Sequence, residues 1–278
     1  MPHHFETLPA AWQTWLRENM QRGCSTESMV EAMFTRGFSR ADAESCIVSA
    51  KFPMPDDMLP FSQIENRSAW TQPTLDGQAI QTLFSISSPD IQLFENVLSP
   101  QECDALVELA KHKLRRSTTV NTQDGSTEII EDRTSSGTYF QLCENEAIAR
   151  IDNRLATLTG HPFAHSEGLQ VIRYIPGGEY KAHFDYFPPD DSGSAMHLQQ
   201  GGQRVCTVVM YLNAVQAGGE THFPDLNLRV HPQKGAALKF SYGSSSGQPD
   251  ARTLHAGMPV VEGEKWIATK WIRERPYI

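Results

Sequence analysis

A histidine and a carboxylate two residues apart, His183 and Asp185, are the first candidates for chemistry in this chain of 278 residues. They follow a strand-like run at 169–174 and the turn Gly177-Gly178. On an extended chain, residues i and i+2 point to the same face. An imidazole nitrogen and a carboxylate oxygen on one strand could therefore reach a single metal ion. A second histidine would complete the 2-His-1-carboxylate arrangement that leaves positions open on non-haem Fe(II).

A third ligand must come from further along the chain, where four histidines are candidates: His197, His222, His231 and His255. His255 is favoured because a strand, a turn at 260–265 and another strand follow it, which places it near Lys265. For His222 we expect a structural or supporting role. The pattern His-x-Asp is common by chance, so the rest of the sequence has to support a metal site.

Composition places the chain among soluble globular proteins, with 39% hydrophobic and 21% charged residues. No apolar run approaches the ~20 residues that span a bilayer, so we expect no membrane association. The net charge of −9 disfavours a nucleic-acid partner, because phosphate binding needs a basic face. The five cysteines are widely spaced, and the first residues lack the pattern of a signal peptide. We therefore expect reduced thiols and a cytoplasmic protein.

Residues 1–60 are predicted to form a small all-α domain. Three apolar-periodic segments between residues 8 and 52 are delimited by Gly23, Gly37 and a capping-box pattern at Ser39. Their tryptophan and methionine residues have the spacing of a helical core, and the exposed face could bind a protein partner. Prolines at 53, 55 and 60 mark a linker, and 61–88 is assigned as linker or transition. The sequence does not say what the first 85 residues do.

The remaining residues, 89–278, are predicted to form an α+β domain. A strand at 91–97 precedes a helix with a strong start at Ser99-Pro100-Gln101-Glu102, and a second helix spans 145–159. From residue 169 onward, short β runs follow one another with Gly, Pro, Asn or Ser between them. This pattern is typical of a β-barrel or a double-sheet jelly roll. The runs are 169–174, 180–186, 204–213, 227–230, 236–241, 253–256 and 265–273.

Several motifs in this domain occur in the order of a known family. They are Tyr180-x-x-His183-x-Asp185, Leu254-His255-Ala256-Gly257-x-Pro259-Val260, Lys265 ten residues after His255, and Trp266-x-x-x-Lys270-Trp271. This order resembles the catalytic domain of prolyl 4-hydroxylases, which are Fe(II)- and 2-oxoglutarate-dependent dioxygenases of the double-stranded β-helix fold. The resemblance covers roughly residues 90–278. It also includes Arg133–Gly137, Tyr211–Asn213 and Gly218–Pro224.

The resemblance implies that His183, Asp185 and His255 are the iron ligands. Neutral imidazoles and a carboxylate suit Fe(II) and leave three positions open, so the chemistry agrees. The residues implied to bind the distal carboxylate of 2-oxoglutarate are Lys265, Tyr174 and Thr221.

The same resemblance implies a peptide groove that includes Tyr180, Trp271, Arg204 and Glu167. Alternation along the last strand supports part of this assignment, because Lys265 and Trp271 share a face that should point into the barrel. A buried lysine there requires an anion. Arg204 is out of phase with Thr207, so at most one of the two points inward unless a β-bulge intervenes.

The function implied by the resemblance is that of a peptidyl-proline 4-hydroxylase, which couples decarboxylation of 2-oxoglutarate to succinate with hydroxylation of a prolyl ring. Its cofactors would be Fe(II), 2-oxoglutarate, O₂ and ascorbate, and its partner a proline-containing peptide or protein. Two alternatives stay open. The same cofactors could serve a lysyl, arginyl or small-molecule hydroxylase, or a nucleic-acid demethylase, which the acidic charge disfavours. A non-catalytic jelly-roll binding protein would have lost a ligand or the lysine, and here all are present.

Overall fold

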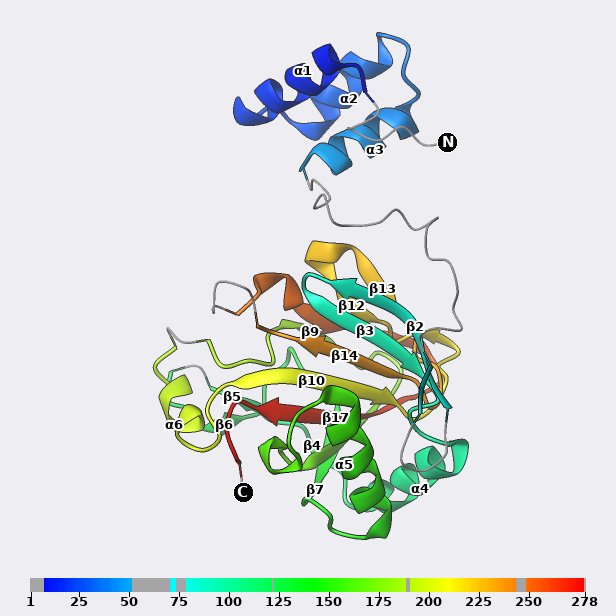
Figure 1. Ribbon diagram of the computed structural model, residues 1–278, viewed down its shortest axis with the longest axis vertical. Helices are drawn as coiled ribbons and strands as arrows, with labels where there is room; N and C mark the ends of the chain where they lie inside the picture. The colour runs from blue at the N-terminus through cyan, green and yellow to red at the C-terminus, as the bar shows by residue number, and fades with distance from the viewer. Residues whose placement is uncertain are drawn as a thin grey trace. The chain divides into compact units, whose positions relative to one another are not determined.

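The chain divides into two compact units, Met1–Asn66 and Arg67–Ile278. The prolines that mark the predicted linker, together with residues 61–70, lie outside the described residues. No helix in the described part of the chain is both long and apolar enough to cross a lipid bilayer. The computed structural model (Figure 1) describes residues 8–51, 71–73, 79–121, 123–188, 191–243 and 249–277.

The first unit contains the three predicted helices, α1 (Ala10–Gln21), α2 (Thr26–Phe34) and α3 (Arg40–Lys51). The Ser25 hydroxyl accepts a hydrogen bond from the backbone N–H of Ser28 and caps α2. Trp12 and Trp15 are partly buried, so the aromatic stripe seen in the sequence packs against the core. The fully buried members of this core are Leu8, Leu16, Met29, Val30, Met33, Ala43, Cys46 and Ile47.

The second unit is built from antiparallel sheets and three described α-helices, α4 (Pro100–Lys111), α5 (Glu146–Thr159) and α6 (Ser194–Gln199). Its larger sheet has the strand order β1 (Thr71–Pro73), β2 (Ala79–Ser87), β3 (Asp90–Glu95), β14 (Ala237–Ser241), β10 (Arg204–Tyr211), β17 (Lys265–Arg273), β8 (Leu169–Tyr174), β7 (Ser136–Phe140) and β4 (Arg115–Arg116). A smaller sheet has the order β13 (Leu228–Val230), β12 (Thr221–Phe223), β15 (His255–Gly257) and β9 (Tyr180–His183). Two short pairs accompany them, β11 (Ala217–Gly218) with β16 (Val260–Glu262), and β5 (Thr119–Val120) with β6 (Thr127–Glu128).

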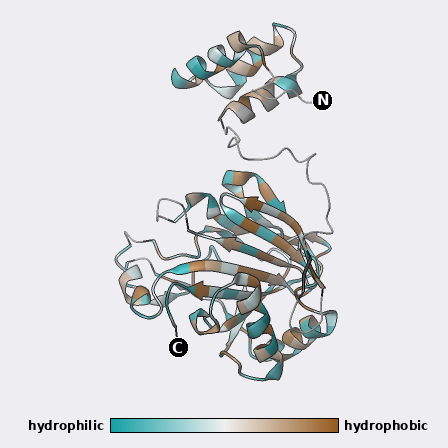
Figure 2. Ribbon diagram, viewed as in Figure 1, coloured by the Kyte–Doolittle hydropathy of each residue, from teal (hydrophilic) through white to brown (hydrophobic). Residues whose placement is uncertain are grey.

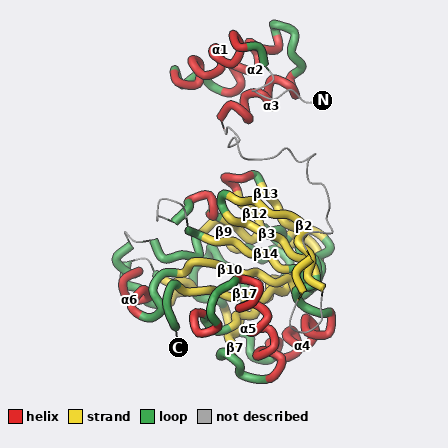
Figure 3. Tube along the Cα trace, viewed as in Figure 1, coloured by secondary structure: helices red, strands yellow, loops and turns green. Residues whose placement is uncertain are grey.

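Alternation along β10 shows how the larger sheet separates two cores. Val208 and Met210 belong to the core that the sheet shares with α4 and α5, whereas Val209 and Tyr211 belong to the core between the sheets. Figure 3 shows α4 and α5 on the opposite side of the larger sheet from β9, β12 and β13. Figure 2 shows hydrophobic residues concentrated on the strands. The predicted α+β jelly roll with flanking helices is therefore confirmed.

The start of α4 forms as its sequence predicts and also holds α5 in place. Ser99 and Glu102 exchange the two hydrogen bonds of a capping box. Glu102 then accepts two hydrogen bonds from Arg154 of α5, at 2.8 and 2.9 Å. Both side chains are buried, and removing one partner of such a pair typically costs about 3–5 kcal/mol. The ion pair therefore links the two helices that cover the sheet.

The sequence did not predict several elements near domain edges and loops. β2 lies within 61–88, the predicted linker, yet it pairs with β3 in the larger sheet. Every second residue of its later part, such as Ser85, is exposed. The strand therefore has no continuous hydrophobic run that would predict it from the sequence. α6 lies between the predicted runs 180–186 and 204–213, in a segment for which the sequence predicted no element. β12 and β16 have only three residues each, too few for a periodic pattern to show.

Candidate active site

His183, Asp185 and His255 come together at neighbouring strands of the smaller sheet. β9 and β15 are antiparallel, and His183 lies opposite His255 in their register. Nε2 of His183 is 3.5 Å from Oδ1 of Asp185, and Nε2 of His255 is 3.7 Å from Oδ2. One ligand atom from each side chain lies within 4.8 Å of the others. Of the four downstream histidines considered from the sequence, the structure brings His255 to this cluster.

Backbone carbonyls fix the orientation of both imidazoles. Nδ1 of His183 is 2.7 Å from the carbonyl oxygen of Lys181, and Nδ1 of His255 is 3.0 Å from that of Thr253. Because a carbonyl oxygen only accepts, each Nδ1 carries a proton, and each ring turns its Nε2 toward the cluster. Burial and the neighbouring His183 lower the pKa of His255 to about 4, although the charge of Asp185 opposes them. A neutral imidazole with a free nitrogen is the form that binds a metal ion.

Asp185 is held through both its side chain and its backbone. Thr207 donates a hydrogen bond to Oδ2 at 2.9 Å, and Arg204 donates to the backbone carbonyl oxygen at 3.0 Å. Burial alone would raise the pKa of Asp185, but the two histidines and Arg204 outweigh it and hold the pKa well below its usual range. The donor set is thus two imidazoles, each with its Nε2 toward the cluster, and one ionised carboxylate. These three residues fit Fe(II), which prefers this set and keeps open positions with it.

A cavity of about 480 Å³ lies against this cluster and is lined by residues of both sheets. Lys265 of β17 lines it and is only 2% exposed. Its ammonium makes no hydrogen bond or ion pair with any residue that the structure describes. Burial lowers the pKa of Lys265 to about 8, against the opposing charge of Glu220. A buried ammonium without a carboxylate partner favours an anionic ligand.

Two hydroxyl-bearing residues line the cavity together with this ammonium. Tyr174 is opposite Lys265 in the register of β8 and β17, and the ammonium nitrogen is 5.4 Å from the centre of its ring. Thr221 also lines the cavity and accepts a hydrogen bond from the phenol of Tyr211 at 2.9 Å. Thr221 therefore keeps its own proton to donate to a ligand. The arrangement offers a cation and a hydroxyl donor to one carboxylate.

One face of β17 is presented to the cavity. The residues of this strand that line the cavity are Lys265, Ile267, Thr269 and Trp271. This confirms the alternation predicted for the strand. Nε1 of Trp271 is buried and has no hydrogen-bond partner among the described residues. An indole N–H in a cavity wall is a donor that a ligand carbonyl can use.

Arg204 and Thr207 both reach Asp185, which a regular strand would not permit. The register of β10 against β17 shifts between Arg204 and Cys206, as in a β-bulge. The shift breaks the alternation of side chains along β10. Arg204 and Thr207 therefore reach Asp185 from the same side of the strand, although they are three residues apart. From the sequence, Arg204 and Thr207 could act on the same side only if a β-bulge lay between them, and the structure contains this bulge.

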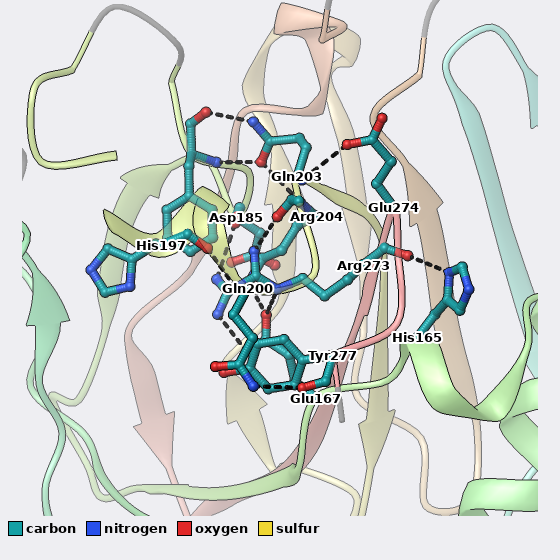
Figure 4. Close-up of polar contacts among 12 residues, drawn as sticks. His165, Glu167, Asp185, His197, Gln200, Gln203, Arg204, Arg273, Glu274 and Tyr277 are labelled. Carbon is teal, nitrogen blue, oxygen red and sulfur yellow. Dashed lines mark hydrogen bonds and ion pairs between the residues drawn. The ribbon is translucent and has the colours of Figure 1, made fainter. Parts of the chain in front are cut away.

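Arg204 is fixed between an aromatic ring and a carboxylate. Its guanidinium carbon is 4.0 Å from the centre of the Trp271 ring. It makes two hydrogen bonds with Glu167, at 2.7 and 3.0 Å (Figure 4). Glu167 also lies 2.9 Å from Nε of Arg273. Glu167 was expected to line the groove, but it is not among the cavity-lining residues in the described part of the chain. Its carboxylate is engaged by the two arginines, and it can reach a ligand only through Arg204.

Tyr180 lies between His183 and Arg133 at the cavity wall. Its ring stacks on the His183 imidazole with the ring centres 3.5 Å apart, and the Arg133 guanidinium is 4.8 Å from its centre. Arg133 is itself held by a hydrogen bond of 2.8 Å to the carbonyl oxygen of Thr118. Burial raises the pKa of Tyr180 to about 12, against the charge of Arg133. The phenol therefore stays protonated and can donate a hydrogen bond near neutral pH.

Some residues around the site carry no local sequence signal. Tyr242 hydrogen-bonds Thr207, and the Gln203 side chain bonds both backbone groups of Phe187. His197 donates from Nε2 to the carbonyl oxygen of Gly125 at 2.8 Å. The partners in these contacts are between 16 and 72 residues apart in the chain. Only the folded arrangement reveals them, because no short motif links such distant positions.

Comparison with known proteins agrees with this geometry. A family model described as the 2OG-Fe(II) oxygenase superfamily matches residues 169–273. Prolyl 4-hydroxylase 2 of Arabidopsis thaliana is 38% identical over 207 residues, which cover 67% of this chain and 68% of that protein. Probable prolyl 4-hydroxylase 6 of the same plant is 37% identical over 239 residues, 79% of each chain. The crystal structure of the viral collagen prolyl hydroxylase vCPH of Paramecium bursaria Chlorella virus-1, a 2OG complex, has a TM-score of 0.52 and 32% identity over 66% of this chain and 95% of that chain.

The jelly roll, the His-Asp-His cluster and the buried lysine define a 2-oxoglutarate- and Fe(II)-dependent oxygenase. Within that superfamily, the chain belongs to the prolyl 4-hydroxylase family. The family resemblance carried by the sequence motifs is thereby confirmed.

Proposed function

We propose that this protein hydroxylates prolyl residues of peptide chains at ring carbon C4. One oxygen atom of O₂ enters the prolyl ring, and the other enters succinate as 2-oxoglutarate loses CO₂. One observation carries the proposal, namely that the His-Asp-His cluster, a buried lysine with no ion pair among the described residues, and aromatic side chains line a single cavity. The residues concerned are His183, Asp185, His255, Lys265, Tyr180 and Trp271.

The residues near the cluster have separate tasks in this proposal. His183, Asp185 and His255 would hold Fe(II), which supplies the activation of O₂ when bound. Lys265 would pair with the distal carboxylate of 2-oxoglutarate, and Thr221 would donate a hydrogen bond to it. Apolar side chains of both β8 and β17 line the same space and would exclude water from it.

The peptide would lie along the aromatic wall of the cavity. Proline-rich chains dock onto aromatic side chains with little loss of conformational freedom, and Tyr180 and Trp271 offer such surfaces. The unpartnered Nε1 of Trp271 would donate to a peptide carbonyl. Arg204 lines the cavity between these aromatic groups and the metal ligand Asp185. Glu167 would position Arg204 without touching the peptide.

The experiment that tests the substrate measures succinate formation by the full chain with Fe(II) and 2-oxoglutarate. We compare a proline-rich peptide, a collagen-like peptide and the proline-rich peptide with every proline replaced by alanine. Stimulation by the proline peptides alone, with a mass gain of one oxygen atom, is the expected result. A preference for the collagen-like peptide would support a procollagen-like specificity. Equal stimulation by the alanine peptide would assign the same cofactors to another substrate.

Three further features belong to the proposal. Ascorbate would support turnover by keeping the iron reduced, which omission of ascorbate from the assay tests. A cytoplasmic location is supported by the five cysteines, none of which forms a disulfide in the part of the chain that the structure describes, and fractionation of cells would check it. The helical first unit would bind a protein partner; its Phe34 side chain, 47% exposed, is the largest exposed apolar group described there.

A further inference from the structure

Two hydroxyl groups on the larger sheet form a buried chain behind Asp185. Thr207 of β10 donates to Oδ2 of Asp185 at 2.9 Å, and the phenol of Tyr242, just after β14, hydrogen-bonds Thr207. Thr207 is 0% and Tyr242 2% exposed, so water does not compete for these bonds. β10 and β14 are paired in register over this stretch, and the two strands therefore hold both hydroxyls in place.

The number of available protons fixes the direction of the chain. A carboxylate that binds a metal ion is ionised and only accepts hydrogen bonds. Thr207 has one hydroxyl proton and uses it on Asp185. The bond between Thr207 and Tyr242 must therefore be donated by the phenol. Donation runs from Tyr242 to Thr207 to Asp185, and each bond polarises the next.

Neither hydroxyl residue belongs to the cavity wall in the described part of the chain. Thr207 and Tyr242 can therefore influence the site only through Asp185. Their relay occupies Oδ2. Oδ1, which is 3.5 Å from Nε2 of His183, receives no hydroxyl donor among the described residues. The two oxygens of one carboxylate thus have different surroundings.

Building on the proposed function, we propose that Tyr242 and Thr207 are positioning residues that make Asp185 a ligand through a single oxygen, Oδ1. The count of coordination positions shows why this matters. On a six-coordinate ion, two imidazoles and one oxygen leave three positions, enough for a chelating 2-oxo acid and O₂. A carboxylate bound through both oxygens would leave only two. Outer groups that orient a ligating carboxylate are a general means of tuning such sites.

The test titrates the purified full chain with Co(II) alone, by calorimetry and by the visible absorption of the bound ion. Thr207→Val removes the relay with little change of shape, and Thr207→Ser restores a hydroxyl. Tyr242→Phe removes only the outer donor. Tyr211→Phe is the matched control, because Tyr211 is another buried tyrosine that donates to a threonine, Thr221, but has no bond to Asp185. Thermal unfolding shows that each variant is folded.

We expect Thr207→Val to weaken Co(II) binding about 10-fold and to change the absorption of the bound ion, with a smaller, ~3-fold loss for Tyr242→Phe. Thr207→Ser should restore most of the affinity, and Tyr211→Phe should bind Co(II) as the unaltered chain does. Equal affinity and unchanged spectra in Thr207→Val and Tyr242→Phe would overturn the relay alone. Failure of the unaltered chain to bind Co(II) would instead overturn the proposed function on which the relay rests.

Discussion

At the scale of single residues, burial and hydrogen bonds set protonation states that suit the proposed cofactors before any of them binds. His255 is kept neutral and Asp185 ionised, as a metal ion requires. Lys265 is different, because burial brings its pKa down to about 8 while its task needs the charged form. In the free protein, the ammonium of Lys265 therefore begins to lose its proton only a little above neutral pH.

This property of Lys265 leads to a pH dependence of 2-oxoglutarate binding. Below pH 8 the ammonium is protonated and attracts the distal carboxylate, so the dissociation constant is low and constant. As pH rises above about 8, the free protein loses the proton and affinity for 2-oxoglutarate falls. Calorimetric titrations with 2-oxoglutarate between pH 6.5 and 9.5 measure this. The Lys265→Arg variant, charged at every pH used, should show a flatter profile. An equally steep fall in that variant would assign the effect to another group.

The sequence could predict the residues that sit in motifs or follow strand alternation. His183, Asp185 and His255 are placed together by motif order, and the inward face of β17 follows from simple alternation. Arg204 and Thr207 could not both be predicted, because a bulge changes their phase. Tyr242 could not be predicted at all, since its bond to Thr207 depends on the pairing of two strands.

At the scale of elements, the end of β17 connects the peptide wall to the segment that carries α6. Arg273 lies 2.9 Å from Glu167, and it donates to the carbonyl oxygens of Gly202 at 2.6 Å and His197 at 3.0 Å (Figure 4). Glu167 in turn holds Arg204. The guanidinium of Arg273 thus lies between α6 and the group that we propose to contact the peptide.

Replacing Arg273 should therefore affect peptide binding more than cofactor turnover. In Arg273→Gln, we expect the KM for a proline-rich peptide to rise on the order of 10-fold, because Arg204 and α6 lose their shared support. Succinate formed without peptide should stay near the level of the unaltered chain, since Arg273 does not line the cavity among the described residues. Steady-state kinetics with varied peptide measure both. Arg115→Gln, at an exposed strand end, is the control. A lowered kcat with an unchanged peptide KM would contradict this role.

Elements with strong local signals were predictable, and those without them were not. The capping box of Ser99 and Glu102 lies at the start of α4 itself, so the local sequence was enough to predict where this helix begins. β2 has a polar face and lies close to Pro73 and Gly77 in the sequence. No local sequence pattern therefore predicted that it pairs with β3. α6 is a single short helix in a segment rich in Pro, Asp, Ser and Gly, and its contacts with Arg273 and Gly125 determine its place.

At the scale of the whole molecule, the described residues of the candidate site all belong to the second unit. All cavity-lining residues that the structure describes fall between Thr118 and Trp271. The first unit has its own core, built from α1, α2 and α3. The described residues of the candidate site and those of the helical core therefore come from different stretches of the chain.

Deletion of residues 1–60 should leave catalysis on short peptides intact. We expect kcat and the peptide KM to stay within about 2-fold of the full chain, because no described cavity residue is removed. A loss of activity confined to protein substrates would assign recruitment to the helical unit. The comparison uses one short proline-rich peptide and one proline-rich protein at equal proline concentration. A large loss of turnover on the short peptide would show that the helices contribute to the site.

The most direct test of the central claim follows oxygen from ¹⁸O₂ into a proline-rich peptide by mass spectrometry. The full chain is incubated with Fe(II), 2-oxoglutarate and ascorbate, beside its His183→Ala variant. We expect one labelled oxygen per modified proline and an equal amount of succinate, with loss of both products in the variant. No labelled proline in any peptide would contradict the prolyl substrate. Full turnover by His183→Ala would contradict the assignment of His183, Asp185 and His255 as the metal site.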